Sequence, residues 1–393
     1  MFQFNFNAKE QQTLDDINAK FDQAYSENAH LEIQSDALNF WNYLVKCEQL
    51  LASGSFVEDE YHHDMENVLS LYVLNELIDK GHLTSTIRQF QLPSSSITKE
   101  QLERDWNVAG CTTGDGTLYA ISKYCQLDPL WTAVLLYYFY YKMFTSKVHP
   151  FVLPALNLSN QTPPSGPEKA TIAIIGDWGT GPWSDGQKKL DPSQLVINAV
   201  KDVNPDIVVH LGDVYYAGTT REEQDNMLDS LMKNYNGQIF TMNSNHEMYD
   251  GANGLMGTTL KDPRFTHQNG STCFSFSVGN WIFVGLDSAY FDESPLYMDG
   301  ALFNSKGHGK EQISYLKNQL VTGKKLMLLT HHNGIKVSKN NPTINTNLWN
   351  QVLGALGNKL PDAWYWGHVH NGIVYDQDLS IFDGKIYGCI PSG

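Results

Sequence analysis

Two patterns of apolar and polar positions divide this chain of 393 residues. Up to about residue 150, apolar side chains recur every three or four positions, as Leu14, Ile17 and Phe21 do. This spacing places them on one face of an α-helix, so the segment is predicted to be mostly helical. The most apolar run, 130–144, is too short to span a bilayer and is predicted to form a buried helix.

A second pattern begins after residue 170, where short apolar runs alternate with amphipathic helices. Such alternation is typical of an α/β domain whose strands are buried on both faces. The segment 154–170, rich in Pro, Ser and Asn, is predicted to link a helical domain (1–153) to this α/β domain (171–393). A hairpin is predicted in CFSFSVGNWIFVGLD, with its turn at Gly279-Asn280.

Polar side chains able to bind a metal ion follow five of the apolar runs after residue 170. In open α/β sheets, ligands bind at the carboxyl ends of the strands, so we expect these side chains to meet at one edge of one sheet. A single such group is more often a turn or a solvated loop, whereas five at successive strand ends form a specific signal. The side chains are Asp177, Asp213, Asn245 with His246, His331 with His332, and His368 with His370.

These strand ends carry the motifs GDWG (176–179), GDVYY (212–216), SNHE (244–247), LLTH (328–331) and GHVH (367–370). The series resembles the motif set of the calcineurin-like metallophosphoesterases and, within that superfamily, the purple acid phosphatase branch. The resemblance runs from about residue 171 onwards and leaves the helical N-terminal domain outside it. It implies a metallophosphoesterase-type β-sandwich flanked by helices.

The same resemblance implies a binuclear metal centre. Asp213 would bridge the two ions, which requires a carboxylate with two oxygens at one point. His332 stays an alternative to its neighbour His331, and Ser244 replaces the usual glycine of its motif, a small-for-small change that is expected to be tolerated. The implied ligands are Asp177, Asp213, Tyr216 and His370 for the first ion, and Asp213, Asn245, His331 and His368 for the second.

The tyrosine ligand bears on the identity of the metals. Gly179 stands where most of the superfamily has a histidine ligand, and the purple acid phosphatase branch replaces that ligand with the tyrosine of Gly-Asp-x-x-Tyr. Tyr216 has this spacing, so Tyr215 is expected to pack elsewhere. A phenol with a pKa of about 10 needs a strongly acidic cation, which favours Fe(III) at the first site and a divalent Fe, Zn or Mn ion at the second. The alternative is that Tyr216 only packs and that both ions are divalent.

The resemblance implies hydrolysis of phosphate monoesters by attack of a metal-bound hydroxide. His246 would contact the phosphoryl group or protonate the leaving alcohol, unless it is a structural loop histidine. Phosphodiesters such as cyclic nucleotides are the second substrate class. A protein Ser/Thr phosphatase is disfavoured, because Tyr216-Ala217-Gly218 replaces the Asp-Arg-Gly of that group. The non-enzymatic alternative is a partner-binding protein that keeps its metals for stability and binds through the N-terminal helices.

Charge and cysteine content restrict the partners and the compartment. A net charge of −16 argues against nucleic acid or an anionic membrane as the main partner. The five cysteines are scattered and form no CxxC pair, which suits a reducing compartment. The N-terminus has no apolar signal segment, so the predicted location is cytoplasmic, with export by an unrecognised route left open.

Overall fold

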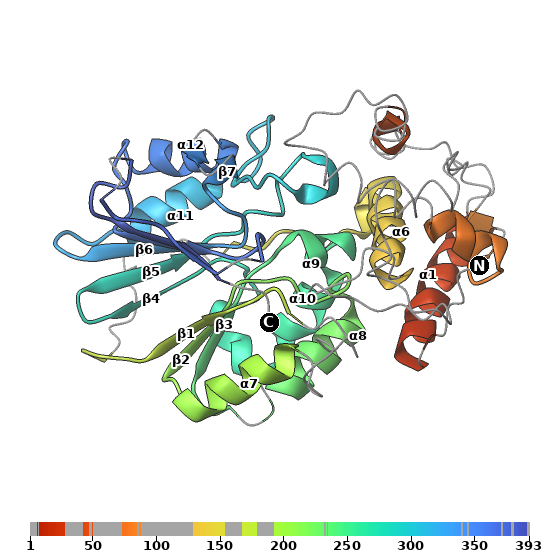
Figure 1. The fold of residues 1–393 in the computed structure, drawn as a ribbon, viewed down its shortest axis with the longest axis horizontal. Helices are drawn as coiled ribbons and strands as arrows, with labels where there is room; N and C mark the ends of the chain where they lie inside the picture. Colours follow the sequence, from red (N-terminus) through yellow and green to blue (C-terminus); the bar gives the residue numbers. More distant parts are fainter. Residues whose placement is uncertain are drawn as a thin grey trace. The chain divides into compact units, whose positions relative to one another are not determined.

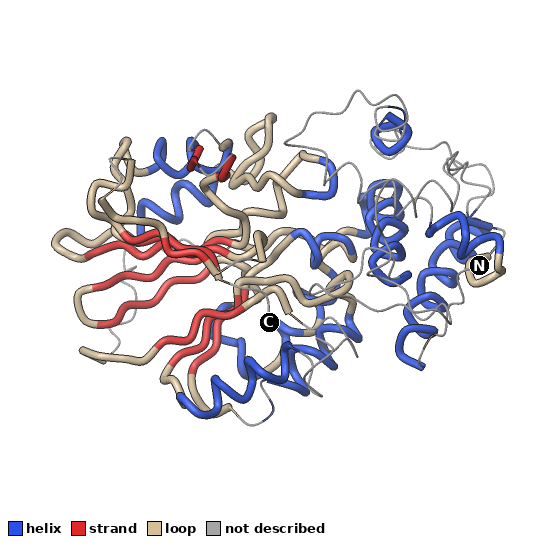
Figure 2. Tube along the Cα trace, viewed as in Figure 1, coloured by secondary structure: helices blue, strands red, loops and turns tan. Residues whose placement is uncertain are grey.

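The computed structural model describes two compact units (Figures 1 and 2). The first unit comprises 1–147 with 182–191, and the second comprises 148–181 with 192–393. The predicted linker lies outside the described residues up to position 166, and the predicted domain boundaries stay a prediction. The described residues are 6, 8–27, 42–46, 49, 73–84, 86–87, 129–153, 167–178, 192–231, 233, 235–338, 341–343, 346–370, 372–378 and 381–390.

The described part of the first unit is helical, as the sequence predicts. Helix α1 (Ala8–Glu27) buries Leu14, Ile17 and Phe21 completely, so its predicted apolar face is confirmed. Helix α6 (Pro129–Met143) is buried along most of its length and is followed by the short helix η2 (Thr145–Lys147). Among the described helices, none combines the length and the apolar character that crossing a membrane would require.

The second unit contains a three-stranded parallel sheet. Its order is β1 (Ile172–Ile175), β2 (Ile207–His210) and β3 (Gln238–Thr241). Helix α7 (Pro192–Val203) connects β1 to β2 and lies along the outer side of this sheet (Figure 1).

A six-stranded mixed sheet faces the first one. Its central strands are parallel, and an antiparallel strand lies at each edge. The predicted hairpin is confirmed as the antiparallel pair of β4 and β5. The order is β10 (Ile373–Val374), β11 (Ile386–Cys389), β9 (Ala363–Trp366), β6 (Lys325–Thr330), β5 (Trp281–Gly285) and β4 (Phe274–Val278).

Aromatic side chains fill the space between the two sheets. Phe240 of β3 stacks on Phe276 of β4 with ring centroids 4.6 Å apart, and Phe276 stacks on Phe283 of β5 at the same distance. A second apolar cluster lies on the other face of the six-stranded sheet, beneath α11 (Glu311–Gln319) and α12 (Asn347–Ala355) (Figure 1). The mixed α/β fold with helix-flanked sheets is therefore confirmed.

One feature of the predicted arrangement is wrong. The five apolar runs that end in polar side chains form β1, β2, β3, β6 and β9, but these strands belong to two sheets, not to one. The remaining elements are short and lie mainly in the loops that follow the strands. They are α8 (Thr220–Glu222), the π-helix η3 (Glu223–Leu231), α9 (Asn245–Tyr249), α10 (Asn253–Gly257), η5 (Thr259–Lys261), η6 (Pro263–Gln268), η7 (Pro295–Tyr297), β7 (Lys336–Ser338) and β8 (Asn341–Thr343).

Candidate metal centre

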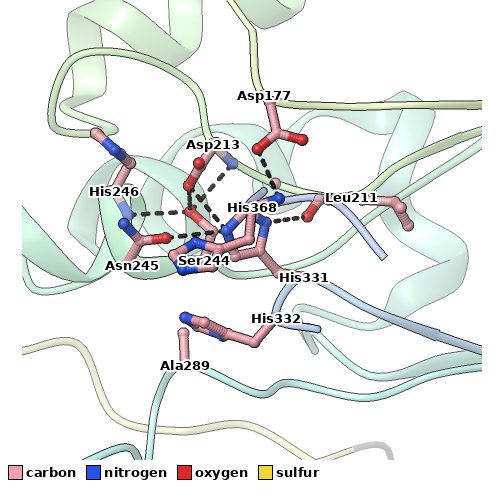
Figure 3. Close-up of polar contacts among 12 residues, drawn as sticks. Asp177, Leu211, Asp213, Ser244, Asn245, His246, Ala289, His331, His332 and His368 are labelled. Atoms are coloured by element: carbon pink, nitrogen blue, oxygen red, sulfur yellow. Dashed lines mark hydrogen bonds and ion pairs between the residues drawn. The ribbon is translucent and has the colours of Figure 1, made fainter. Parts of the chain in front are cut away.

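The loops after β1, β2, β3, β6 and β9 converge at one end of the two facing sheets. They bring together two groups of side chains, and within each group the potential ligand atoms lie within 4.8 Å of one another. Figure 3 shows most of these side chains pointing toward a common centre. The groups are Asp177, Asp213 and His370, called the first donor group below, and His331, His332 and His368, called the second donor group.

The first donor group contains a carboxylate oxygen that lacks a partner. His370 Nε2 lies 3.2 Å from Asp177 Oδ1 and 3.8 Å from Asp213 Oδ2. Asp177 Oδ1 also accepts the backbone N–H of His368 at 2.8 Å. The other oxygen of Asp177 is buried and has no hydrogen-bond partner among the described residues. Because a buried carboxylate without compensation is costly, this oxygen fits the binding of a cation.

The second donor group is oriented by the backbone. His331 Nδ1 lies 2.8 Å from the Leu211 carbonyl oxygen, so it donates its hydrogen there and Nε2 faces the centre (Figure 3). Nε2 lies 2.9 Å from Asn245 Oδ1 and 3.2 Å from Asp213 Oδ1. Asp213 therefore contacts the second group through Oδ1 and the first group through Oδ2, which is the arrangement that a bridging carboxylate needs.

His332 belongs to the second donor group by position, but its ring nitrogens face other partners. Nδ1 lies 2.9 Å from Ser288 Oγ, and Nε2 lies 2.6 Å from the Tyr297 carbonyl oxygen. A carbonyl can only accept, so His332 Nε2 carries a hydrogen and cannot bind a metal in this arrangement. The geometry thus favours His331 over His332 as the ligand.

The tyrosine at the first donor group is Tyr215. Its hydroxyl lies 2.6 Å from His370 Nε2 and 3.3 Å from Asp213 Oδ2, so the expectation that Tyr215 packs elsewhere is wrong. The hydrogen bonds described for Tyr216 run through its backbone, from its N–H to Glu222 Oε1 and from His246 Nδ1 to its carbonyl oxygen. A ligand role for Tyr216 stays a prediction, and Gly179 lies outside the described residues.

Glu222 explains how this loop is held. Its carboxylate accepts the backbone N–H groups of Tyr216, Ala217 and Thr219, and the Thr219 hydroxyl completes a capping box with it. These bonds fix the backbone after Asp213 and thereby the directions of both tyrosine side chains. The direction of each tyrosine side chain therefore could not be predicted from the Gly-Asp-x-x-Tyr spacing alone.

His246 is the second residue of α9 and packs against the loop after β2 that carries Tyr215 and Tyr216. Its Nδ1 lies 2.5 Å from the Tyr216 carbonyl oxygen, and its ring packs edge to face on Tyr215 with centroids 4.6 Å apart. Burial lowers the pKa of His246, against the attraction of the nearby Asp213 carboxylate. His246 is therefore neutral at neutral pH, with Nδ1–H donated to the loop.

Burial also sets the protonation of the donor groups. It lowers the pKa of His331 to about 3 and that of His368 well below its usual range, so both imidazoles are neutral, the form that binds metals. Burial raises the pKa of Asp177 to about 6. Burial of the Asp177 carboxylate thus costs free energy that a bound cation would offset.

Four of the donor residues have left-handed backbones. Asp177, Asp213, His368 and His370 have φ angles of 54°, 64°, 66° and 60°. Residues other than glycine seldom adopt this conformation, and where they do they cluster at functional sites. Gly367 lies close to the same carboxylate: a Cβ there would lie 2.4 Å from Asp177 Oδ2 and would displace it.

Two residues for which the sequence predicts no specific role lie in direct contact with Asp213. Glu247 accepts the backbone N–H groups of Asp213 at 3.2 Å and Val214 at 2.7 Å. The Ser244 hydroxyl contacts the carboxylates of both Asp213 and Glu247. A signal was present, because Ser244 and Glu247 have the Ser-x-x-Glu spacing of a capping box at the start of α9.

This chain is similar to one protein family and to several solved structures. The family model for calcineurin-like phosphoesterases matches residues 170–372. A dimetal phosphatase from Danio rerio is similar in structure with a TM-score of 0.37 and 15% identity, covering 56% of this chain and 87% of that chain. A Staphylococcus aureus protein assigned as a 5′-nucleotidase, in complex with α-ketoglutarate, has a TM-score of 0.35 and 13% identity, covering 56% of this chain and 48% of that one. No curated protein matches this chain in sequence.

Proposed function

The chain belongs to the calcineurin-like phosphoesterase family, and we propose that it hydrolyses small phosphate monoesters with two bound metal ions. The observation that carries the proposal is the position of Asp213, whose two oxygens contact the two donor groups separately. When bound, the cations supply Lewis-acid stabilisation of the phosphoryl charge and make water acidic enough to attack at neutral pH.

The residues that would hold the ions follow from the contacts. Tyr215 joins the first donor group, since its hydroxyl reaches both His370 and Asp213. Asn245 joins the second, since its Oδ1 lies beside His331 Nε2. The proposed ligands are Asp177, Asp213, Tyr215 and His370 for the first ion, and Asp213, Asn245, His331 and His368 for the second.

His246 is proposed to bind the phosphoryl group or the leaving oxygen. Its Nδ1–H is donated to the Tyr216 carbonyl, so the neutral ring presents Nε2 as an acceptor. An anionic ester close to the ring favours the imidazolium form, in which Nε2–H can donate to a phosphoryl oxygen or protonate the leaving alcohol. The same contact with Tyr216 fixes the direction of the ring.

A comparison of two model esters tests the substrate class. After reconstitution with metal, the protein is expected to hydrolyse p-nitrophenyl phosphate with a kcat/KM at least about tenfold above that for bis(p-nitrophenyl) phosphate, a difference of about 1.4 kcal/mol in transition-state stabilisation. A preference for the diester would make the protein a phosphodiesterase. If neither ester were cleaved by protein that holds two ions, the proposed hydrolysis would be wrong.

We further propose Fe(III) at the first donor group and a divalent Fe, Zn or Mn ion at the second. A phenolate ligand requires a strongly acidic cation, and a tyrosinate bound to Fe(III) gives the protein a visible absorption band. Iron-loaded wild-type protein is expected to be coloured, Tyr215→Phe to lose the band, and Tyr216→Phe to keep it. If only Tyr216→Phe lost the band, Tyr216 would be the ligand of the first ion, as the spacing of the Gly-Asp-x-x-Tyr motif predicts. An active protein without iron would refute Fe(III).

A further inference from the structure

Ser244 connects the loop after β2 to the start of α9. The side chain is completely buried. Its Oγ accepts two backbone N–H groups at 3.0 Å, one from Asp213 and one from His246. The same oxygen lies within hydrogen-bond distance of Asp213 Oδ1 and Glu247 Oε2 (Figure 3 shows the contacts with Asp213). The hydroxyl thus contacts the backbone and the side chain of Asp213 at once.

A side chain fits at this position because of its neighbour Gly212. Gly212 has a φ of +90°, and a Cβ there would lie 2.8 Å from the Cβ of Ser244. The absence of a side chain at position 212 therefore leaves the space that Ser244 occupies.

The hydroxyl has one hydrogen to donate, and both Asp213 Oδ1 and Glu247 Oε2 lie within hydrogen-bond distance of it. Glu247 is already stabilised by two backbone N–H groups, those of Asp213 and Val214. Asp213 Oδ1 accepts no backbone N–H in the part of the chain that the structure describes, and its other described neighbour is His331 Nε2. His331 donates its one ring hydrogen from Nδ1 to the Leu211 carbonyl, so Nε2 has none to donate, and Ser244 is the side-chain donor on which Oδ1 depends among the described residues.

We propose that Ser244 is a positioning residue for the bridging carboxylate, which it holds with one oxygen directed at each donor group and so increases the affinity of the metal pair. This inference rests on the proposed function, because it assumes that Asp213 binds both ions. An aspartate free to rotate would lose side-chain entropy on binding, whereas one already held by Ser244 loses less. Hydrogen-bond partners of metal ligands typically change metal affinity by about 10–100-fold.

The competing explanation is that Ser244 only caps α9, where it is the N-cap residue. Glycine and alanine separate the two roles. Glycine is a good N-cap residue and alanine a poor one, so a purely capping role predicts that Ser244→Gly behaves like the wild type. Both substitutions remove the hydroxyl from Asp213, so a positioning role predicts that both weaken metal binding.

The experiment titrates Zn²⁺ into metal-free protein by calorimetry and records the thermal unfolding of each metal-free variant. Wild-type protein is expected to bind two ions, and Ser244→Gly and Ser244→Ala to bind them about 10–100-fold more weakly. Ser275→Ala is the matched control. Ser275 lies on β4, away from the donor groups, and donates its hydroxyl to Gln319 of α11, so this variant is expected to bind Zn²⁺ like the wild type.

Two outcomes would overturn the inference in different ways. If Ser244→Gly binds Zn²⁺ like the wild type while Ser244→Ala unfolds at a lower temperature, Ser244 is only a helix cap, and the proposed function stands. If wild-type protein itself binds no ions, the proposed function fails and the inference fails with it.

Discussion

Asp213→Asn is expected to lower kcat/KM for p-nitrophenyl phosphate by about a thousand-fold or more. Among the described residues, Asp213 is the one whose two side-chain oxygens contact both donor groups. Asparagine keeps the size of the side chain but has no charge and only one oxygen. The two ions therefore lose the carboxylate that would bridge them. Lewis-acid stabilisation is worth several kcal/mol, and about 4 kcal/mol corresponds to roughly a thousand-fold in rate.

The measurement combines steady-state kinetics with the metal content of the purified variant. Asp299→Asn is the matched control, because Asp299 forms an exposed pair with Lys336 at 2.9 Å, with more than half of each side chain accessible to solvent. Such pairs contribute little, so this variant should hydrolyse the ester like the wild type. Unchanged hydrolysis in Asp213→Asn would instead favour the partner-binding alternative, in which the metals serve stability.

His331→Ala is expected to reduce the bound metal from two ions to one and to lower kcat/KM by more than about a hundred-fold. The imidazole of His331 is held by the Leu211 carbonyl with Nε2 directed at Asn245 and Asp213. Removing it takes one nitrogen ligand from the second ion and leaves the carbonyl without its donor. A loss of about 3 kcal/mol of Lewis-acid stabilisation gives an effect of this size.

His332→Ala is the comparison that makes the result specific. Its ring nitrogens are engaged by Ser288 and by the Tyr297 carbonyl, so this variant should keep both ions. It should unfold at a lower temperature, because buried groups left without a partner cost about 1–3 kcal/mol each. Metal analysis and thermal unfolding of both variants check the pair. Loss of an ion in His332→Ala with two ions retained in His331→Ala would exchange the roles of the two histidines.

The sequence alone was informative wherever the signal is local. The helical spacing of Leu14, Ile17 and Phe21 predicted α1, since burial of one helix face requires apolar residues every three or four positions. The apolar runs predicted the buried strands, and Gly279-Asn280 predicted the turn between β4 and β5. The polar residues that follow these runs predicted the donors, since a strand end places the next side chain at the edge of its sheet.

The folded chain decided what depends on contacts between distant segments. The donor strands belong to two sheets, because strand pairing depends on partners that lie far away in sequence. The fold directs the Tyr215 hydroxyl toward the first donor group, so Tyr215 becomes a candidate ligand beside Tyr216. Glu222 fixes the backbone of the loop after β2 that carries both tyrosines. The fold also distinguishes His331 from His332 as candidate ligands. His331 donates from Nδ1 to the Leu211 carbonyl and leaves Nε2 available, whereas His332 donates from Nε2 to the Tyr297 carbonyl.

Ser244 shows the division most clearly. A serine three residues before Glu247 has the spacing of a capping box, so the sequence is consistent with the helix cap that Ser244 forms. Its contact with Asp213 arises only when the loop after β2 lies against the start of α9, with Gly212 leaving room for the side chain. Local preferences are properties of neighbouring residues and can be read along the chain. The direction of each side chain at the metal centre is a property of packing, and only the tertiary structure fixes it.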